Sequence, residues 1–430
     1  MTEPVPALPD PFEDLPTTGG GPDPGTAAIR VTGPSALIAS VPHLLGFRPT
    51  ASLVVVVLSG ERNQVRVTAR IDLPTAPAPG YAAGVAGRLT RARGDQAVVV
   101  VYPPDTDTGT EPGRAAPPTD PAAYADLVDE VAAALTDRDL ALRDALWVQA
   151  GRWGSYLCSD PGCCPAEGRP LDDADALRAR SSLVLAGLGV MPDRQALVES
   201  LAPEADASDE AAVRAALHRV TTGQVVLPLT PRAVVDEVAA VLARPRVRAA
   251  RHLLTAHEVA LVLGALAGIR VRDGLMHRLT DHARNRGPGA GAGPDLLVRA
   301  EQALSECTRR AVGGAVAPVA TVLAAVAWLT GSGARALVAL DRALDDDPGY
   351  TLAHLLRAAI DGGLPPQQWA TWIDEVSLAQ CLGEESGPEQ AATDPTRVAW
   401  GSTSVTGRGS RRRSRRRRGP DPSAGDPSVA

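Results

Sequence analysis

Lysine is absent from this chain of 430 residues, and aromatic side chains make up only 3% of it. All of its basic side chains are therefore arginines, which indicates a GC-rich coding bias before it indicates any function. The amino terminus lacks a basic start followed by an apolar segment, and this absence argues against a secretory signal peptide. We therefore expect a cytoplasmic protein whose five cysteines are reduced, so metal or redox chemistry is favoured over a disulfide framework.

Recognisable catalytic motifs are also missing. The sequence contains no GxSxG elbow, Walker loop, HExxH motif or paired-carboxylate motif. Residues 286–294, RGPGAGAGP, follow no expected strand and lack the GxGxxG register, so they predict a flexible connector and not a phosphate-binding loop. These absences favour a non-enzymatic binding or scaffold protein, whose site would lie at the edge of a sheet or at the junction of two domains.

One apolar run is long enough to raise the question of a membrane span. Residues 311–334 contain no charged side chain and exceed the roughly 20 residues that a bilayer requires. The run is mostly alanine, glycine and valine, and Gly313, Gly314 and Pro318 interrupt it. The pattern indicates a buried helix beginning near Pro318, and we expect no membrane partner.

The first part of the chain predicts a layered α/β domain with a mixed sheet over residues 29–168, after a disordered segment at 1–28. Residues 53–58 are continuously apolar, as expected for a strand covered on both faces. Residues 65–71 alternate apolar with polar side chains, the period of a strand with one wet face. Right-handed crossovers would leave the last two strands parallel. The other expected elements are a strand at 29–31, helices after Pro34, at 81–92 and after Asp120, and strands at 97–102 and 146–150.

Residues 169–382 predict an all-helical domain, followed by a disordered tail at 383–430. Capping residues mark several helix starts, including Thr230 and the capping box of Thr255 with Glu258. Helical periodicity recurs through this part without a convincing strand. The fold class is therefore α/β plus all-α.

A helical hairpin of the tetratricopeptide type is predicted within this domain, at residues 325–356. Trp328 and Gly331 lie at its turn, and Pro348 ends its second helix. A lone hairpin of this kind cannot bury its own apolar face, so the surrounding helices must complete the stack.

The most distinctive feature is a short loop with Cys158, Cys163 and Cys164, stiffened by Pro161 and Pro165. Its cysteines suit three roles: small buried side chains that fasten the two domains, ligands of a structural zinc ion, or reactive thiols. The gap from Cys158 to Cys163 suits zinc, but adjacent cysteines rarely ligate one metal well, and no nearby histidine completes the set. Zinc is the cofactor this loop would take, and a thiol- or zinc-dependent enzyme is the alternative function.

A pocket is expected at the carboxyl ends of the strands, where α/β sheets usually bind ligands. Those ends carry Asp72, the loop at Asp105, and the stretch that leads into the cysteine loop. We therefore predict that Asp72, Arg152, Trp153 and Tyr156 line the pocket, with an unknown protein or small molecule as the partner.

The body of the chain is acidic and its tail is basic. The formal net charge is −7, and the nine arginines and six acids after residue 382 contribute +3, which leaves −10 for the body. An acidic body argues against a broad nucleic-acid-binding face. Nucleic acid is therefore a partner for the tail alone, and deletion of residues 407–430 should abolish any salt-sensitive binding. The tail arginines are Arg411, Arg412, Arg413, Arg415, Arg416, Arg417 and Arg418.

Three separated motifs resemble the actinobacterial family known as domain of unknown function 4192. They are VPHLLGFRPTASLVVV at residues 41–56, GRWGSYLCSDPGCCP at 151–165, and the hairpin sequence at 327–356. The resemblance covers residues 29–382 and implies a cytoplasmic actinobacterial protein. It implies no reaction, ligand or catalytic residue.

Overall fold

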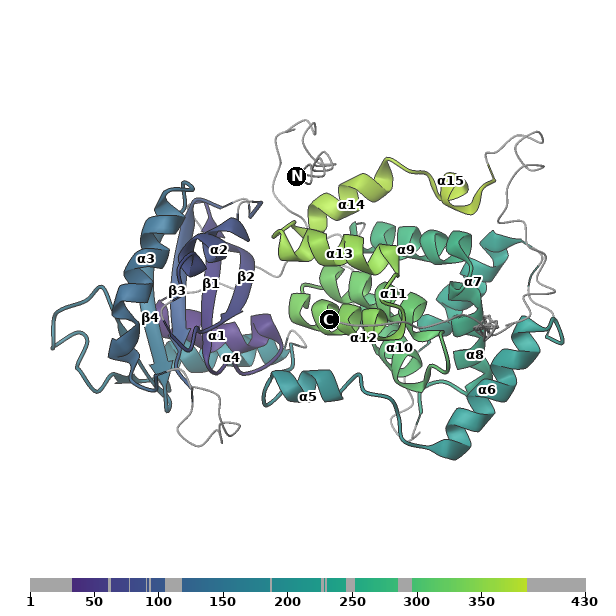
Figure 1. Ribbon diagram of the computed structural model, residues 1–430, viewed down its shortest axis with the longest axis horizontal. Coiled ribbons are helices and arrows are strands. Elements are labelled where there is room, and N and C mark those ends of the chain that lie inside the picture. Colours follow the sequence, from purple (N-terminus) through teal and green to yellow (C-terminus); the bar gives the residue numbers. More distant parts are fainter. Residues whose placement is uncertain are drawn as a thin grey trace, which may run out of the picture.

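The computed structural model describes residues 33–384 except for 61–62, 77, 90, 93, 105–117, 186–187, 226–227, 229, 245–251 and 285–295. A β-sheet with its covering helices lies at one end of the molecule, and a larger group of helices forms the other end (Figure 1). Several expected features lie outside the described residues: the disordered start, the strand at 29–31, the loop at Asp105, the connector at 286–294 and the arginine tail.

Six strands form one mixed sheet in the order β2-β1-β3-β4-β5-β6. β3 and β4 are parallel, and all the other neighbouring strands are antiparallel. The parallel pair confirms the expected crossover, and the sheet confirms the predicted fold class. The strands are β1 (Ser52–Ser59), β2 (Gln64–Asp72), β3 (Gln96–Tyr102), β4 (Ala141–Gln149), β5 (Arg152–Ser155) and β6 (Arg169–Pro170).

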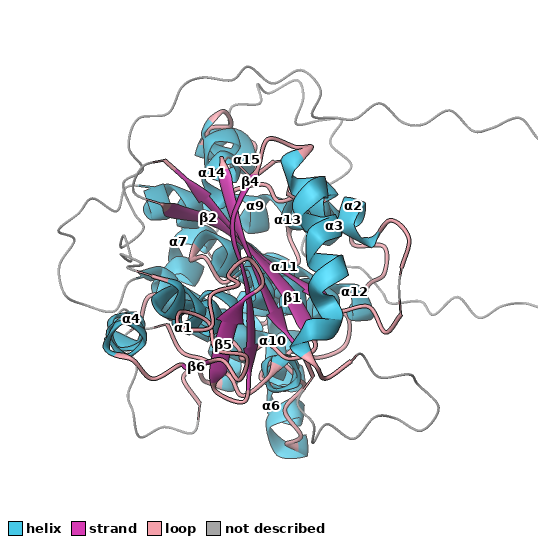
Figure 2. Ribbon diagram, turned by 90° about the vertical axis from the view of Figure 1, so that its left-hand side faces the viewer, coloured by secondary structure: helices cyan, strands magenta, loops and turns pink. Residues whose placement is uncertain are grey.

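The two faces of the sheet are buried in different cores. Leu53 and Val55 of β1 join the core beneath α2 and α3, whereas Val54 and Val56 join the core that includes α1. Figure 2 shows α3 and α1 on opposite sides of the twisted sheet. β1 is continuously apolar because both of its faces are covered. The helices of this part are α1 (Pro34–Leu45), α2 (Tyr81–Gly87), α3 (Ala125–Thr136) and α4 (Ala174–Leu185).

α4 packs along α1 through small side chains. Ala36 and Ala39 of α1 form a buried cluster with Ala176 and Ala179 of α4, which lets the two helices approach closely. Asp173 caps α4 through the backbone N–H of Ala176 and also accepts a hydrogen bond from the hydroxyl of Ser35, so the two helices begin side by side. α4 follows residue 168 and still packs against α1 of the first part, and the division of the chain at that residue stays a prediction.

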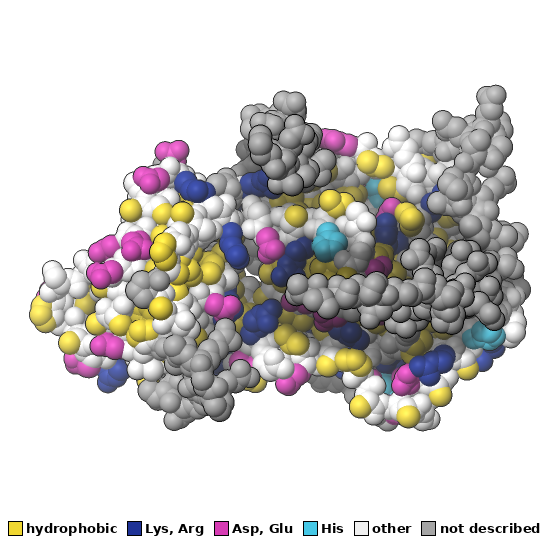
Figure 3. All heavy atoms as spheres, in the orientation of Figure 1, with side chains coloured by type: hydrophobic (Ala, Val, Ile, Leu, Met, Phe, Trp, Pro, Cys, Tyr) yellow, Lys and Arg dark blue, Asp and Glu magenta, His cyan; other side chains and the backbone are white. Residues whose placement is uncertain are grey.

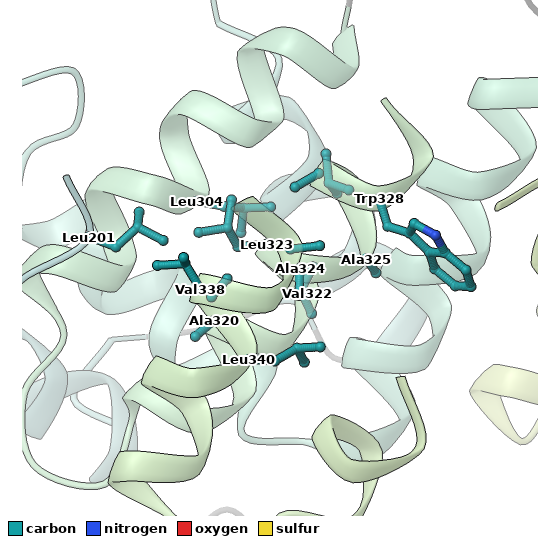
Figure 4. Packing of buried hydrophobic residues seen from close by; sticks show 14 of the residues in the cluster. Leu201, Leu304, Ala320, Val322, Leu323, Ala324, Ala325, Trp328, Val338 and Leu340 are labelled. Carbon is teal, nitrogen blue, oxygen red and sulfur yellow. The ribbon is translucent and has the colours of Figure 1, made fainter. Parts of the chain in front are cut away.

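The larger group of helices surrounds α11 (Val316–Leu329). Every residue of α11 from Val316 to Trp328 except Pro318 is buried. Figure 4 shows Leu201, Leu304, Val338 and Leu340 packed around it. The other helices are α5 (Arg194–Glu199), α6 (Ala207–Thr221), α7 (Pro231–Leu242), α8 (Ala256–Leu266), α9 (Ile269–Arg284), α10 (Leu296–Arg310), α12 (Gly333–Asp346), α13 (Thr351–Asp361), α14 (Pro366–Asp374) and α15 (Leu378–Leu382).

The uncharged run around α11 is therefore a buried helix, as expected, and it begins at Val316, two residues before Pro318. Within the described ranges, no helix is long and apolar enough to cross a membrane. α12 follows α11 across a short turn at Gly331, whose φ of +87° is accessible to glycine without strain. The tetratricopeptide interpretation of this hairpin stays a prediction.

Local sequence signals set several helix boundaries. Thr230 accepts a hydrogen bond from the N–H of Ala233 at 3.3 Å, and Thr255 and Glu258 make both hydrogen bonds of the predicted capping box. Asp120 is also a cap, but it caps a 3₁₀ turn, η1 (Pro121–Tyr124), that leads into α3.

Some boundaries differ from the expectations. α2 ends at Gly87 and not at residue 92, and β4 begins at Ala141, five residues before the predicted start at 146. Arg143 and Asp144 interrupt the apolar pattern of β4, so its first half carries no strand signal. The sequence did not predict β5 and β6. Segments of four and two residues are too short to show a periodic apolar pattern, and they form strands only by pairing with a neighbouring strand.

Candidate functional site

The cysteine loop follows a tight hairpin between β4 and β5. Ala150 and Gly151 form its two-residue turn with φ values of +47° and +73°, the left-handed pair that fits the twist of the flanking strands. Gln149 pairs with Arg152, and Leu146 pairs with Ser155. The cysteine loop therefore starts beside the middle of β4.

Trp147 holds both ends of the cysteine loop. A Cβ atom at Gly154 would lie 2.6 Å from Nε1 of Trp147, and one at Gly168 would lie 2.4 Å from the Cη2 atom of the same ring. Gly168 also has a φ of +75°, and its carbonyl accepts a hydrogen bond of 2.7 Å from Arg152. Only glycine lets the backbone lie this close to the indole at both points.

Asp160 shapes the turn that gathers the cysteines. Its carbonyl accepts hydrogen bonds from the N–H groups of Cys163 at 3.1 Å and Cys164 at 2.7 Å. Its carboxylate accepts another from the N–H of Gly162 at 2.9 Å. Because Pro161 also restricts the backbone, the turn brings Cys163 and Cys164 back toward Cys158.

The structure brings the three cysteines predicted as metal ligands into one cluster. The sulfur atoms of Cys158, Cys163 and Cys164 all lie within 4.8 Å of one another. Cys163 is exposed and the other two are half-buried, so the cluster faces solvent. In the described part of the chain, no other group of three or more such side chains could hold a metal ion.

The cysteines at the two ends of the loop differ in acidity. The backbone N–H of Asp160 and the thiol of Cys164 donate to the sulfur of Cys158 and lower its pKa. Burial, followed by the hydrogen bond to Cys158, raises the pKa of Cys164 to about 11. In the absence of metal, Cys158 therefore carries the thiolate character of the cluster and Cys164 donates to it.

Ser155 fastens the loop to the sheet. Its hydroxyl donates to Oδ1 of Asp144 in β4 at 2.8 Å and accepts from the N–H of Leu157 at 3.1 Å. Its backbone N–H donates to the sulfur of Cys164. One residue thus joins the cysteine cluster to β4, a link that the sequence did not indicate because hydroxyls carry no spacing signal.

The four side chains predicted to line a pocket are not brought together. Asp72 is exposed at the end of β2 and pairs with Arg70 at 2.5 Å, whereas Arg152 lies on β5, with β1, β3 and β4 between them. Trp153 is buried on the α1 side of the sheet, and Tyr156 packs on the α3 side. Arg152 and Tyr156 instead hold the backbone, through the carbonyls of Gly168 and Pro121.

The remaining cysteines lie apart from the cluster. Cys307 is buried in α10, and burial raises the pKa of its thiol. Cys381 lies half-buried in α15, and burial raises its pKa as well. Both are packing residues in the helical part. The arginine tail offered as an anionic-partner site lies outside the described residues.

Fold and site together define a two-part protein: a mixed α/β sheet with a surface trio of thiols, followed by a helical part. A model of the family described as Domain of unknown function (DUF4192) matches residues 34–367, which is most of the chain. The chain belongs to this family. No curated protein and no solved structure matches it.

Proposed function

We propose that this protein is a non-enzymatic binding protein of the cytoplasm that holds a zinc ion in the loop of Cys158, Cys163 and Cys164. The observation that supports this role is the convergence of three sulfur atoms within 4.8 Å of one another. Two sulfurs bound to one tetrahedral zinc at about 2.3 Å each lie about 3.8 Å apart, so small side-chain rotations are enough.

The surroundings of the loop suit a zinc–thiolate centre. Three thiolates around Zn²⁺ carry a net charge of −1, and the guanidinium of Arg169 donates to the carbonyl of Cys163 at 3.4 Å. A positive group beside the loop offsets that charge. The turn at Asp160 orients two of the ligands before metal arrives, which lowers the ordering cost of binding.

The fourth coordination position falls to water or to a group from a partner. No described histidine, cysteine or carboxylate joins the three cysteines. A partner that supplies the fourth ligand would dock at the β5–β6 edge of the sheet, which agrees with the role of a scaffold. On the face seen in Figure 3, acidic and basic side chains of the described residues are interspersed, so this face favours a protein or small-molecule partner over nucleic acid.

A thiol- or zinc-dependent enzyme is the second candidate. The lowered pKa of Cys158 favours it, because the thiolate is the reactive form of cysteine. A zinc ion with three protein ligands and one open position also has the arrangement of catalytic zinc sites.

Metal content tests the proposal directly. The full chain is purified under reducing conditions without added metal, beside Cys158→Ser and the control Cys381→Ser. We expect about one equivalent of zinc in the wild type and in the control, and a large loss in Cys158→Ser, because only that variant removes a ligand. Cobalt substitution should show tetrahedral thiolate absorption in the same two proteins.

Absence of zinc from the wild type, together with failure to take up zinc or cobalt, contradicts the proposal. Thiols that then react quickly with a disulfide reagent, and slow down in Cys158→Ser, favour the second candidate. Slow thiols without metal contradict both candidates.

A further inference from the structure

A second site lies on the α1 side of the sheet, near the start of β4. A cavity of about 260 Å³ opens where α1 begins, between that helix and the ends of β1, β3 and β4. Its apolar wall is aliphatic and consists of Leu37, Leu58, Val98 and Leu146. This volume lies just below the roughly 300 Å³ at which drug-sized pockets begin, so the cavity suits a smaller molecule.

A β-bulge directs a cation to this cavity. Ala97 pairs with Leu142 and Val98 pairs with Asp144, so Arg143 is an extra residue in β4. Bulges of this kind change the direction of a side chain and concentrate beside functional sites. The side chains of Arg143 and Asp144 consequently both line the cavity, although they are neighbours in one strand.

The charge of Arg143 is not neutralised within the described chain. Its Nη1 donates to the amide oxygens of Asn63 at 2.5 Å and Gln96 at 3.0 Å, both of which are neutral. These two bonds hold the guanidinium at the mouth of the cavity. Its other N–H groups have no partner among the described residues, so they can bind a carboxylate with the paired geometry that arginine favours.

Asp144 supplies the opposite charge at a fixed position. Its Oδ1 accepts hydrogen bonds from the N–H of Ala145 and from the hydroxyl of Ser155, both at 2.8 Å. The two donors orient the carboxylate. Within the described ranges Oδ2 accepts no hydrogen bond, and a cationic group in the cavity would satisfy it.

We propose that this cavity binds a free aliphatic α-amino acid in its zwitterionic form. Arg143 would bind the carboxylate, Asp144 would bind the ammonium group, and the four aliphatic residues would enclose a branched side chain. A ligand with both charges is favoured over a simple anion because Asp144 would repel an anion from the cavity. The proposal goes beyond zinc binding and does not depend on it.

Calorimetry on the full chain with L-leucine tests the proposal. We expect saturable binding and a rise in Tm, since ligand binding to the folded state stabilises it. 4-Methylpentanoate lacks the ammonium group, 3-methylbutylamine lacks the carboxylate, and L-serine lacks the aliphatic body. Each of these compounds should bind at least about tenfold more weakly than L-leucine, because each loses one charge-assisted bond or the apolar contact.

Variants connect the binding to the residues named. Arg143→Gln should weaken binding of L-leucine about tenfold or more, whereas Arg138→Gln, at an exposed arginine away from the cavity, should leave it unchanged. Val98→Phe should fill the cavity and abolish binding. Arg143→Gln should keep its zinc, so failure at this site is distinguishable from failure at the cysteines.

Three outcomes overturn the proposal: no binding of L-leucine by the folded wild type, equal binding of 4-methylpentanoate, or unchanged binding in Arg143→Gln. If 4-methylpentanoate binds as tightly as L-leucine, Asp144 does not bind an ammonium group. Unchanged binding in the arginine variant places any amino acid elsewhere on the molecule.

Discussion

Loss of Arg310 of α10 should strongly destabilise the helical part. Its side chain is 1% exposed and makes a two-pronged pair with Asp209 of α6, at 2.7 and 2.8 Å. It also donates to Glu306 at 2.7 Å and to the carbonyl of Leu254 at 2.6 Å. The guanidinium therefore joins α10 to α6 and to the segment before α8.

Substitution of Arg310 by methionine keeps much of the volume and removes the charge. Glu306, 3% exposed, and Asp209, 15% exposed, would be left as a buried and a half-buried carboxylate without the guanidinium. Breaking one side of such a buried network costs about 3–5 kcal/mol, a large part of the roughly 5–15 kcal/mol by which domains are stable. We expect a loss of that size in the free energy of unfolding.

Urea denaturation measures this loss by linear extrapolation. The double variant Arg310→Met with Glu306→Gln should lose less than the sum of the two single variants, by about 1–3 kcal/mol, because the glutamine removes one of the two carboxylates that the methionine leaves without a cation. Arg178→Met is the control, since its pair with Asp175 is 75% and 43% exposed and should contribute less than about 1 kcal/mol. A loss below about 1 kcal/mol in Arg310→Met, or strict additivity in the double variant, refutes the reasoning.

Two further predictions concern the cysteine loop and the start of α4. Gly168→Ala should lower the free energy of unfolding by about 1–3 kcal/mol and lower zinc affinity, because its Cβ would meet Trp147. The control is Gly151→Ala, since Gly151 has a similar φ of +73° but open space around it. Thermal unfolding should show a smaller loss of stability in the control. Asp173→Ala should cost about 1 kcal/mol at pH 7. Hydrogen bonds, first from the N–H of Ala176 and next from Ser35, lower the pKa of Asp173 in the folded state. Its contribution is therefore complete above the ordinary value of 3.8 and disappears as the pH falls through the folded pKa. Unfolding curves of the wild type and of Asp173→Ala should converge in acid. A difference that persists there contradicts the role of the Asp173 carboxylate as the cap of α4.

Short stretches of sequence were sufficient for the features that depend on neighbouring residues. The apolar run of β1 predicted a strand buried on both faces, and the pair Thr255 and Glu258 predicted a capping box, because both signals lie within one element. The uncharged run around α11 predicted a buried helix for the same reason. The cysteine spacing left three roles open, since a loop of seven residues admits several conformations.

Tertiary structure alone decided which distant residues meet. Asp72 lies on β2 and Arg152 lies on β5, and the strand order places β1, β3 and β4 between them. Arg143 reaches the cavity because of a bulge in the pairing of β3 with β4, and Arg310 meets Asp209 across 101 residues of chain. Sequence periodicity describes one element at a time, whereas register and helix packing depend on the partner across the contact. Fold class and helix starts were therefore determined by the sequence, and the placement of charges by the packing.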